Sequence, residues 1–372
     1  MEIIGIIAEY NPFHNGHIYH INKIKEMYPN SLIILALNGY FLERGEVSIL
    51  SKEEKTKISL ENNVDIVTEI PFVFGSQSAD TFADISCQIL NTLGCTKLIF
   101  GSETNDINLL TKIAKKELEN DFNDKVKKEI NKGVNYPTAL NKSIGIDINT
   151  PNDLLGISYI KTILKNNLNI EPITIQRTND YHDKKSNDTI ISASNIREKI
   201  KNKEDISKYT PYQDLILNYN EDDLFKLLKY KILTDHNLNS YLTVDEGIEY
   251  KLIKEINNVN SLDELINKIK SKRYTYNRLR RMLIHILIGL TKIDRNNLKL
   301  EYIKVLGFNQ KGQDYLKTIK KDIPIQRKIS DKYLAQKYEL TSSCIYDLLS
   351  GSNSYEFEKS NKPIKYNENA KN

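Results

Sequence analysis

The sequence has 372 residues, of which 40% are apolar and 27% charged, and its formal net charge is +4. This length excludes a single small module, and the composition is typical of a globular protein rather than a disordered or membrane protein. No apolar run approaches the roughly 20 residues that a membrane-spanning helix requires. No charged leader, apolar run and cleavage site open the sequence, so we expect a cytoplasmic protein with no membrane contact.

Short apolar runs in the first half of the chain predict buried strands. They cover residues 2–8, 31–37, 65–70, 97–100 and 172–176. Apolar residues recur at helical spacing along 17–27 and 79–93, and Ser51 with Glu54 forms a capping box before a further helix. Strands and helices that alternate at these lengths predict an α/β domain with a doubly wound parallel sheet.

The second half of the chain predicts helices. Thr150 with Pro151 marks one helix start, and Ser192 or Ser194 marks another. Beyond Lys208, four amphipathic segments follow one another with no strand between them, at residues 222–233, 246–256, 261–270 and 277–290. The last stretch is polar, which predicts disorder. We therefore expect an α/β domain over residues 1–205, an all-helical domain over 206–358 and a disordered tail over 359–372.

The stretch "EYNPFHNGHIYH", residues 9–20, directly follows the first predicted strand. A helix start at the carboxyl end of a parallel strand offers free backbone N–H groups and a positive dipole end, which together bind anions. His14 and His17 lie on either side of the turn and can both stabilise the phosphoryl oxygens of a triphosphate. Gly16 lets the backbone approach the ligand.

Two other interpretations of this motif remain open when it is taken alone. One is a metal cluster of His14, His17 and His20, but Glu9 is the only carboxylate nearby and no cysteine is close, so we expect no metal site. The other is a structural turn. His20 fits an ordinary helix face. The cysteines, Cys87, Cys95 and Cys344, lack metal-ligand spacing and fit core thiols.

A second motif, "ISASNIR" at residues 191–197, resembles the I-S-S-T-x-I-R motif of nucleotidyltransferases of the H-x-G-H class. Serine hydroxyls at a helix start, with an arginine one turn later, bind the β and γ phosphates from the side opposite the histidines. The two motifs in this order predict His14, His17, Ser192 and Arg197 as catalytic residues. A surface role is the alternative for Arg197.

The resemblance extends over nearly the whole chain. "GIIAEYNPFHNGHIYHI", "RGE", "FGSE", "TPNDLLGISYI", "QRTNDYHD", "ISASNIR", "KRYTYNRLRRMLIHIL" and "VLGFNQKGQDYL" follow one another as in the bacterial tRNA(Met) cytidine acetate ligase family. This resemblance implies a nucleotidyltransferase-like domain that uses ATP, expected with Mg²⁺, to activate acetate as acetyl-adenylate. It further implies transfer of the acetyl group to N4 of the wobble cytidine of elongator tRNA(Met), with AMP and pyrophosphate as products.

The resemblance also implies which residues bind ATP. They are Ile7, Ala8, Glu9, Tyr10, Asn11, Pro12, Phe13, His14, Asn15, Gly16, His17, Ile18, Tyr19, His20, Gly101, Asn152 and Arg177. Gly101 ends a predicted strand, where ligands of open sheets bind. The sequence departs from the family at "LNGYFLERGE", where Asn38, Tyr40 and Glu43 replace the usual residues and Arg44 is kept.

A basic stretch in the helical half predicts contact with RNA. Between residues 270 and 281 there are no acidic residues, and aromatic residues alternate with cations that can neutralise phosphates while the rings stack on unpaired bases. The predicted contacts are Lys272, Arg273, Tyr274, Tyr276, Arg278, Arg280 and Arg281. A solvated helix face is the alternative for this stretch.

Two other functions stay open. An adenylyltransferase for a small phosphorylated metabolite would share the H-x-G-H motif but has no need of a basic helical half. A non-catalytic RNA-binding protein with a relict nucleotide fold would not need His14, His17, Ser192 and Arg197. The sequence does not define the oligomeric state, the acyl group, or the residue that accepts the amine proton.

Overall fold

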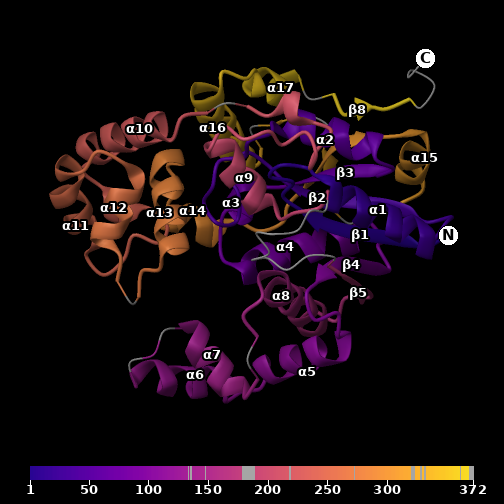
Figure 1. The fold of residues 1–372 in the computed structure, drawn as a ribbon, viewed down its shortest axis with the longest axis horizontal. Coiled ribbons are helices and arrows are strands. Elements are labelled where there is room, and N and C mark those ends of the chain that lie inside the picture. Colours follow the sequence, from indigo (N-terminus) through magenta and orange to yellow (C-terminus); the bar gives the residue numbers. More distant parts are fainter. Residues whose placement is uncertain are drawn as a thin grey trace.

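The computed structural model describes residues 1–132, 134, 136–146, 148–177, 189–217, 219–271, 273–319, 323–326, 329–330, 332–360 and 362–367. Its strands are β1 (Ile3–Ala8), β2 (Leu32–Asn38), β3 (Ile66–Ile70), β4 (Lys97–Ser102), β5 (Glu171–Gln176), β6 (Ile303–Phe308), β7 (Ile325–Gln326) and β8 (Ile364–Lys365). Figure 1 shows the sheet flanked by helices, with a separate group of helices at one side.

The first helices belong to the part of the chain that builds the sheet. They are α1 (Asn15–Met27), α2 (Lys52–Glu61), α3 (Phe72–Gly75), α4 (Ala79–Thr92), α5 (Ile107–Glu117), α6 (Phe122–Asn131), α7 (Tyr136–Ile144), α8 (Pro151–Lys165) and α9 (Ala193–Lys201). The later helices are α10 (Glu221–Thr234), α11 (Ile248–Glu255), α12 (Leu262–Ile269), α13 (Tyr276–Ile288), α14 (Lys292–Asn297), α15 (Gln310–Thr318), α16 (Leu334–Ser350) and α17 (Ser354–Ser360).

The central sheet has the strand order β5-β4-β1-β2-β3-β6-β7, and β8 pairs with β6. The first five strands run parallel, with Ala8 at the end of β1 beside Leu37 near the end of β2. The strand order reverses between β1 and β4, and open parallel sheets bind ligands at the carboxyl ends of such strands. The predicted α/β fold is therefore confirmed, and its topology marks one edge of the sheet as the place for a site.

Both faces of the sheet are covered, which explains why its strands are continuous apolar runs. Along β2, Ile33 and Leu35 belong to the same buried cluster as Ile21 of α1. The alternate residues Leu32 and Ile34 belong to the cluster on the other face, which includes residues of α4 and α8. A strand places successive side chains on opposite faces, so the two helical layers share one strand between them.

Two parts of the predicted organisation need correction. The region expected to be all helical contains β6, which pairs antiparallel with β3 and extends the sheet beyond the parallel strands. The tail expected to be disordered contains β8, which pairs with β6 at Ile364 and Lys365. Both strands pair with partners far away in the sequence; β6 is interrupted by Lys304 and Gly307, and β8 has only two residues, so neither is a continuous apolar run.

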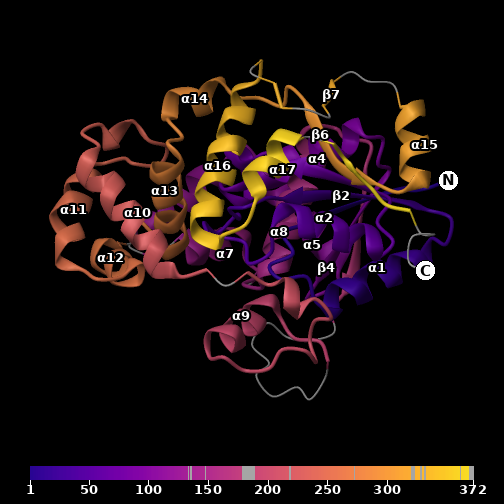
Figure 2. The same ribbon diagram turned by 90° about the horizontal axis from the view of Figure 1, so that it is seen from above.

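The four helices predicted after residue 208 are present as α10 to α13. Figure 2 shows them gathered beside the sheet, with α16 and α17 lying between this group and the sheet. Figure 1 shows the α10–α13 group and the lobe of α5 to α7 as separate projections of the molecule. The domain boundaries at residues 205 and 358 remain predictions.

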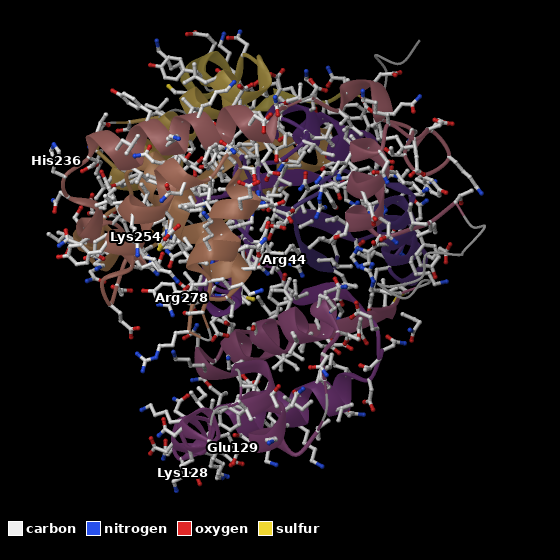
Figure 3. The ribbon with its side chains drawn as sticks, turned by 60° about the vertical axis from the view of Figure 1, so that its left-hand side comes forward. Arg44, Lys128, Glu129, His236, Lys254 and Arg278 are labelled. Carbon is white, nitrogen blue, oxygen red and sulfur yellow. The ribbon has the colours of Figure 1, made fainter. Side chains whose placement is uncertain are left out.

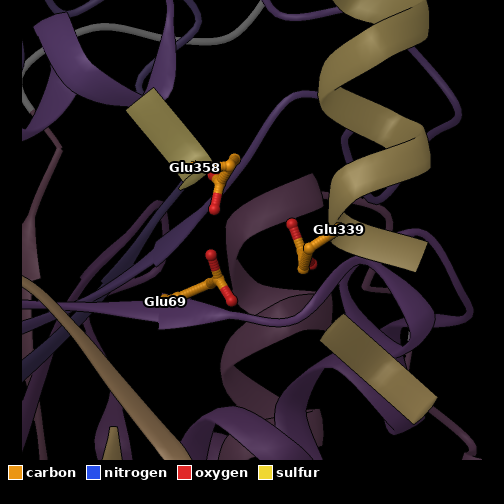
Figure 4. Close-up of side chains that lie close together, drawn as sticks. All are labelled: Glu69, Glu339 and Glu358. Atoms are coloured by element: carbon orange, nitrogen blue, oxygen red, sulfur yellow. The ribbon is translucent and has the colours of Figure 1, made fainter. Parts of the chain in front are cut away.

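A buried cluster of charges fastens α16 and α17 to the sheet. Figure 4 shows the carboxyl groups of Glu69 from β3, Glu339 from α16 and Glu358 from α17 turned toward one another. Lys52 Nζ of α2 lies 2.6 Å from Glu69 Oε2, 2.9 Å from Glu339 Oε2 and 2.7 Å from Glu358 Oε1. Lys304 pairs with Glu69 and Glu358. The ammonium groups already occupy the space between the carboxylates, so this donor set does not fit a metal ion.

Candidate active site

A cavity of about 530 Å³ lies where the strand order of the sheet reverses. Its walls come from β1 and the loop that follows it, from the loop after β2, and from the ends of β4 and β5. The N-terminal parts of α8, α9 and α13 complete it, the last through Asn277. The cavity thus brings both sequence motifs together although they are more than 170 residues apart. A second hollow, between α5 and α8, is lined by apolar residues and asparagines and carries no ionisable group.

His14 and His17 form a reciprocal cap at the start of α1. The Gly16 N–H donates to His14 Nδ1 at 3.0 Å, and the His14 N–H donates to His17 Nδ1 at 3.1 Å. A neutral imidazole carries one proton, so with Nδ1 accepting, the proton of each ring is on Nε2. The helix cap therefore fixes both rings as Nε2–H donors. The helix begins at Asn15, earlier than the predicted start at His17, because His14 acts as the cap.

Burial keeps both imidazoles neutral. It lowers the pKa of His14 to about 3, with help from the guanidinium groups of Arg177 and Arg197. The pKa of His17 is also well below its ordinary value, first because of burial and then because of His14 and Arg177. A neutral ring donates from Nε2 without placing a full charge in the cavity. The two rings stack with their centroids 3.9 Å apart, so they present their donors side by side.

Gly16 is required by the cap itself. A Cβ atom at this position would lie 2.7 Å from Cε1 and 3.0 Å from Nδ1 of His14. The predicted reason for Gly16, close approach of a ligand, is therefore joined by a contact with the histidine ring. Just before this turn, Tyr10 has a φ of 49°, in the left-handed region that a tyrosine rarely adopts. Strain of this kind is typical of functional loops.

Arg177 lies at the end of β5, beside Gly101 at the end of β4. A Cβ atom on Gly101 would meet Arg177 Cγ at 3.4 Å, so the two residues are in contact. Arg177 Nε is 3.7 Å from Glu103 Oε1 and is buried with no hydrogen-bond partner among the described residues. Asn152 donates to the same Glu103 oxygen at 2.5 Å. This side of the cavity therefore holds a cation with an unused donor.

The second motif forms the opposite wall. The Ser192 hydroxyl accepts the Asn195 N–H at 3.2 Å and caps α9, as the sequence predicted. Arg197 Nη1 donates to the Asn11 carbonyl at 2.7 Å, and Nη2 pairs with Glu46 Oε2 at 3.0 Å. Arg197 thereby joins α9 to the loop after β1 and to the loop after β2. Arg197 is therefore not a free surface cation, and its guanidinium group has protein partners besides any phosphate that it binds.

A network that the sequence did not predict supports the loop after β2. Glu9 Oε1 accepts the Asn38 amide at 2.8 Å and the Glu43 N–H at 2.7 Å. Fully buried Lys55 donates to the carbonyl groups of Glu9, Asn38 and Gly39 at 3.1, 2.6 and 2.7 Å. Burial lowers the pKa of Lys55 to about 7, while the Glu9 carboxylate raises it and the Lys52 ammonium lowers it further. No pattern in "SKEEKTKISL" distinguishes this lysine from Lys52, which is buried elsewhere, or from the half-buried Lys57.

The cavity contains most of the residues that the resemblance predicts for ATP. Those that line it are Ile7, Ala8, Glu9, Tyr10, Asn11, His14, Gly16, His17, Tyr19, His20, Gly101, Asn152 and Arg177. Ser192 and Arg197, predicted as catalytic residues, line it as well. Pro12, Phe13, Asn15 and Ile18 do not line it. Phe13 is fully buried in the core, and the Asn15 amide donates to the carbonyls of Thr189 and Lys208. These residues shape the loop from behind.

His20 is placed differently from the expectation of an ordinary helix face. It lines the cavity, and its Nε2 is buried with no partner among the described residues. Burial lowers its pKa to about 4, with Arg177 as the second cause. Spacing of three residues along a helix places His17 and His20 on the same side, and that spacing was the signal in the sequence.

The predicted RNA-binding stretch needs a correction for its buried members. Tyr274 is buried and its hydroxyl donates to the Asp245 carbonyl at 2.6 Å, and the Tyr276 hydroxyl donates to Asp263. Arg280 is also buried and pairs with Glu221 at 2.9 Å. The stretch has no acidic residues of its own because distant segments supply them. The buried side chains of Tyr274 and Arg280 are therefore not accessible to bases, whereas Tyr276 is half-buried.

Arg281 turns toward the cavity rather than toward solvent. Its Nη1 lies 3.2 Å from Glu43 Oε1, while the backbone of Arg280 packs on Gly45 so closely that a Cβ there would lie 2.6 Å from it. Gly45 has a φ of 73°, which also favours glycine. The start of α13 is thus docked on the loop that lines the cavity.

Arg273 is exposed and Arg278 is half-buried at the surface. Arg273 pairs with Glu246 at 2.9 Å, and Arg278 stacks over Tyr274 and approaches Asp245 at 3.8 Å. Figure 3 shows Arg278 at the edge of the α10–α13 group and Lys128 at the tip of the α5–α7 lobe. Lys272 lies outside the described residues.

Two of the three cysteines lie where the sequence predicted. Cys87 and Cys95 are buried, as expected, but Cys344 is exposed on α16 and is not a core thiol. Among the described residues, no helix combines the length and the apolar character needed to cross a bilayer.

A doubly wound sheet, a cavity at its switch point and two histidines on a helix start define a nucleotidyl transferase of the class named after its HIGH motif. The family described as HIGH Nucleotidyl Transferase matches residues 1–362. The chain is 38% identical over 353 residues to the tRNA(Met) cytidine acetate ligase of Geobacillus sp. (strain WCH70), a match that covers 87% of this chain and 88% of that protein. It is 40% identical over 353 residues to that of Ligilactobacillus salivarius, covering 89% and 91%.

Solved structures agree. Thermotoga maritima TmcAL in its apo form I superposes with a TM-score of 0.86 at 25% identity, and the crystal form II bound with alpha-thio ATP superposes with 0.85 at 26%. Each match covers 98% of this chain and 99% of the other. The chain belongs to the family of tRNA(Met) cytidine acetate ligases.

Proposed function

We propose that this protein is an ATP-dependent ligase that activates acetate as acetyl-adenylate and acetylates N4 of the wobble cytidine of elongator tRNA(Met). Family membership supports this reaction, because the relatives carry that name. The observation that carries the proposal is the pair of neutral imidazoles whose Nε2–H groups are left for a ligand in a cavity at the switch point.

The nucleotide lies across the switch point. The triphosphate meets Nε2–H of His14 and His17 from the start of α1, and Arg177 and Arg197 compensate its charge. Asn152 and Gly101, which has no side chain, border the nucleoside. Acetate oxygen attacks the α-phosphate in line and pyrophosphate leaves, so the protein contributes by positioning and by stabilising charge on the phosphoryl oxygens. Ser192 orients α9 for this purpose.

Mg²⁺ enters this proposal as part of the nucleotide substrate. Each cavity carboxylate already has a partner: Glu9 accepts two N–H donors, Glu43 pairs with Arg281 and Glu46 pairs with Arg197. These residues do not offer an uncompensated pair of carboxylates, so they do not fit a resident metal ion. Mg²⁺ favours substrate phosphates and water in such sites. This chain's residues then bind the phosphates rather than the ion.

The tRNA approaches from the side of α13. Arg273 and Arg278 are the accessible cations of the predicted stretch, and Lys128 on α6 is exposed as well. Cations neutralise phosphates without reading sequence, so these residues would position the RNA. The anticodon loop closes the cavity and shields acetyl-adenylate from water. A tRNA substrate places the protein in the cytoplasm.

ATP–pyrophosphate exchange with and without acetate tests the proposal, in parallel with nucleoside mass analysis of elongator tRNA(Met) incubated with ATP and acetate. We expect acetate-dependent exchange and one acetyl group on a cytidine. Exchange that requires a phosphorylated metabolite instead would support a small-metabolite adenylyltransferase. ATP binding without exchange under any condition would support a non-catalytic RNA-binding protein.

A further inference from the structure

The second half of the proposed reaction needs a group that accepts a proton. The exocyclic amine of cytidine is a weak nucleophile, and a neutral product forms only when one of its protons is removed. His14 and His17 are poor candidates, because their Nδ1 atoms accept backbone N–H groups and their Nε2 atoms already carry the proton. Carboxylates are the groups that accept hydrogen bonds from N4 of cytosine. Among the described residues, the carboxylates that line the cavity are Glu9, Glu43 and Glu46.

These three carboxylates differ in how they are compensated. Glu43 pairs with Arg281 at 3.2 Å, and Glu46 pairs with Arg197 at 3.0 Å. Proton transfer to either would leave a guanidinium without its counter-ion. Glu9 has no arginine or lysine within ion-pair distance among the described residues. Its Oε1 accepts two neutral N–H donors, and among those residues no hydrogen bond to Oε2 is formed. Glu9 is thus oriented by one oxygen and has the other available.

The position of Glu9 also suits the acceptor. The residues proposed for the nucleoside, Gly101 near the end of β4 and Asn152 at the start of α8, lie on one side of the switch point. Glu9 follows β1 on the other side, next to Asn38 at the end of β2, since Ala8 and Leu37 are paired in the sheet. The loop after β2 continues to Glu43, which contacts α13 of the helical half through Arg281. An RNA base that enters beside α13 therefore reaches Glu9 before it reaches the nucleotide.

We propose that Glu9 is a catalytic residue that accepts the amine proton during acetyl transfer, an inference that rests on the proposed function. The amine nitrogen attacks the carbonyl carbon of acetyl-adenylate, and an N–C bond forms. The bond between that carbon and the phosphate oxygen breaks, and AMP leaves with the electron pair on its phosphate. The proton moves from nitrogen to Glu9 Oε2, which turns the carboxylate into the neutral acid.

The surroundings of Glu9 suit this proton transfer. Burial raises its pKa, the hydrogen bonds from Glu43 and Asn38 lower it, the neighbouring Glu46 carboxylate raises it and the Lys55 ammonium lowers it. The net direction is upward from 4.5, toward the operating pH, where a general base is most effective. The base must be ionised to act, so the transfer rate rises with pH through the pKa of Glu9 and then levels off.

The two half-reactions can be measured separately. ATP–pyrophosphate exchange with acetate reports the first, and single-turnover mixing of chemically prepared acetyl-adenylate with elongator tRNA(Met) reports the second. In Glu9→Gln, Oε1 still accepts both N–H donors but the side chain accepts no proton. We expect the transfer rate to fall about 100-fold to 10,000-fold, far more than exchange, and the rise with pH to disappear. Glu9→Asp keeps a carboxylate and is expected to restore the pH dependence.

Glu43→Gln is the matched control, because Glu43 contacts Glu9 through its backbone N–H. We expect a much smaller fall in transfer and a rise with pH that is kept, shifted to lower pH because the Glu43 and Glu9 carboxylates raise each other's pKa. If Glu43→Gln abolishes the pH dependence and Glu9→Gln keeps it, the base is Glu43 and the proposal is wrong. Equal losses of transfer and exchange in Glu9→Gln, with ATP binding lost, would show a purely structural role and also overturn it. A wild-type protein that shows neither half-reaction would refute the proposed function itself.

Discussion

Two groups of buried charges in this molecule are built in opposite ways. In the cluster around Lys52, two ammonium groups and three carboxylates neutralise one another, and the Tyr40 hydroxyl donates to Glu358 at 2.9 Å. In the cavity, His14, His17 and Glu9 are each fixed by one side-chain atom while another is left for a ligand, and Arg177 Nε has no hydrogen-bond partner among the described residues. The first group holds the C-terminal helices on the sheet, and the second is preorganised for a ligand.

The difference lies in where the counter-charges come from. In the cluster they come from α16 and α17, so both ammonium groups have carboxylate partners once the chain has folded. In the cavity, acceptors for Arg177 Nε and for the Nε2–H groups of His14 and His17 are left to a ligand. Groups buried without partners cost free energy, and a fold keeps such groups where a function needs them.

The largest effect on stability should follow from breaking the charge cluster around Lys52. Lys52→Met leaves Glu69, Glu339 and Glu358 buried with Lys304 as their only counter-ion, so we expect a loss of about 3–5 kcal/mol in the free energy of unfolding. Urea denaturation measures it. Lys23→Met is the control, because its pairing with Glu26 is exposed and should contribute nothing measurable. Equal stability of both variants would contradict the account of the cluster.

Changing the polar groups of the cavity should lower activity instead of stability. His17→Asn keeps an acceptor near the Nδ1 position for the His14 N–H but removes the Nε2–H donor. We expect pyrophosphate exchange to fall about 100-fold to 1,000-fold, the usual effect of losing one preorganised donor. His236→Asn is the matched control, since His236 is exposed on the α10–α13 group (Figure 3). Wild-type exchange in His17→Asn would remove the basis for the triphosphate site.

The cluster also predicts a pH dependence. Burial and the nearby Glu69 carboxylate raise the pKa of Glu339 to about 7 from 4.5. Its contribution to stability is therefore fully present below about pH 4.5 and is lost as the pH rises through about 7. Relative to Glu339→Gln, the wild-type protein should lose about 1–3 kcal/mol between about pH 5 and pH 8. Urea denaturation of both proteins at both pH values checks this; parallel curves would contradict it.

The smallest effect is expected at the surface. Arg273→Ala with Arg278→Ala removes surface cations, so tRNA binding should weaken several-fold and the slope of affinity against salt should drop by roughly 1–2. Filter binding at several salt concentrations measures both. Arg280→Ala should instead lower stability, because Arg280 is buried against Glu221. The reverse result would restore the stretch as a stacking and phosphate surface.

The sequence predicted the first five strands because parallel strands covered on both faces are continuous apolar runs. It predicted His14, His17 and Ser192 because caps and turns are local, within a few residues of the chain. It did not predict β6 or β8, since each is a strand only through pairing with a distant segment. Lys55 and Asn38 were missed as site residues for the same reason, because their partners are brought near by the sheet.

The basic stretch shows the same limit for the exposure of charged residues. Counting acidic residues between positions 270 and 281 suggested free cations, yet Glu221, Glu43, Asp263 and Asp245 supply partners from other elements. Charge along a segment says little about exposure until packing is known. The two arginines that stay at the surface, Arg273 and Arg278, could not have been separated from Arg280 and Arg281 by spacing alone.

The affinities of ATP and AMP, compared by titration calorimetry, test most directly whether the open polar groups serve a triphosphate. We predict that the wild-type protein binds ATP at least about tenfold more tightly than AMP, since each tenfold step is 1.4 kcal/mol and two donors and two arginines meet the added phosphates. His17→Asn should reduce this preference. Equal affinities for ATP and AMP in the wild-type protein would contradict the account.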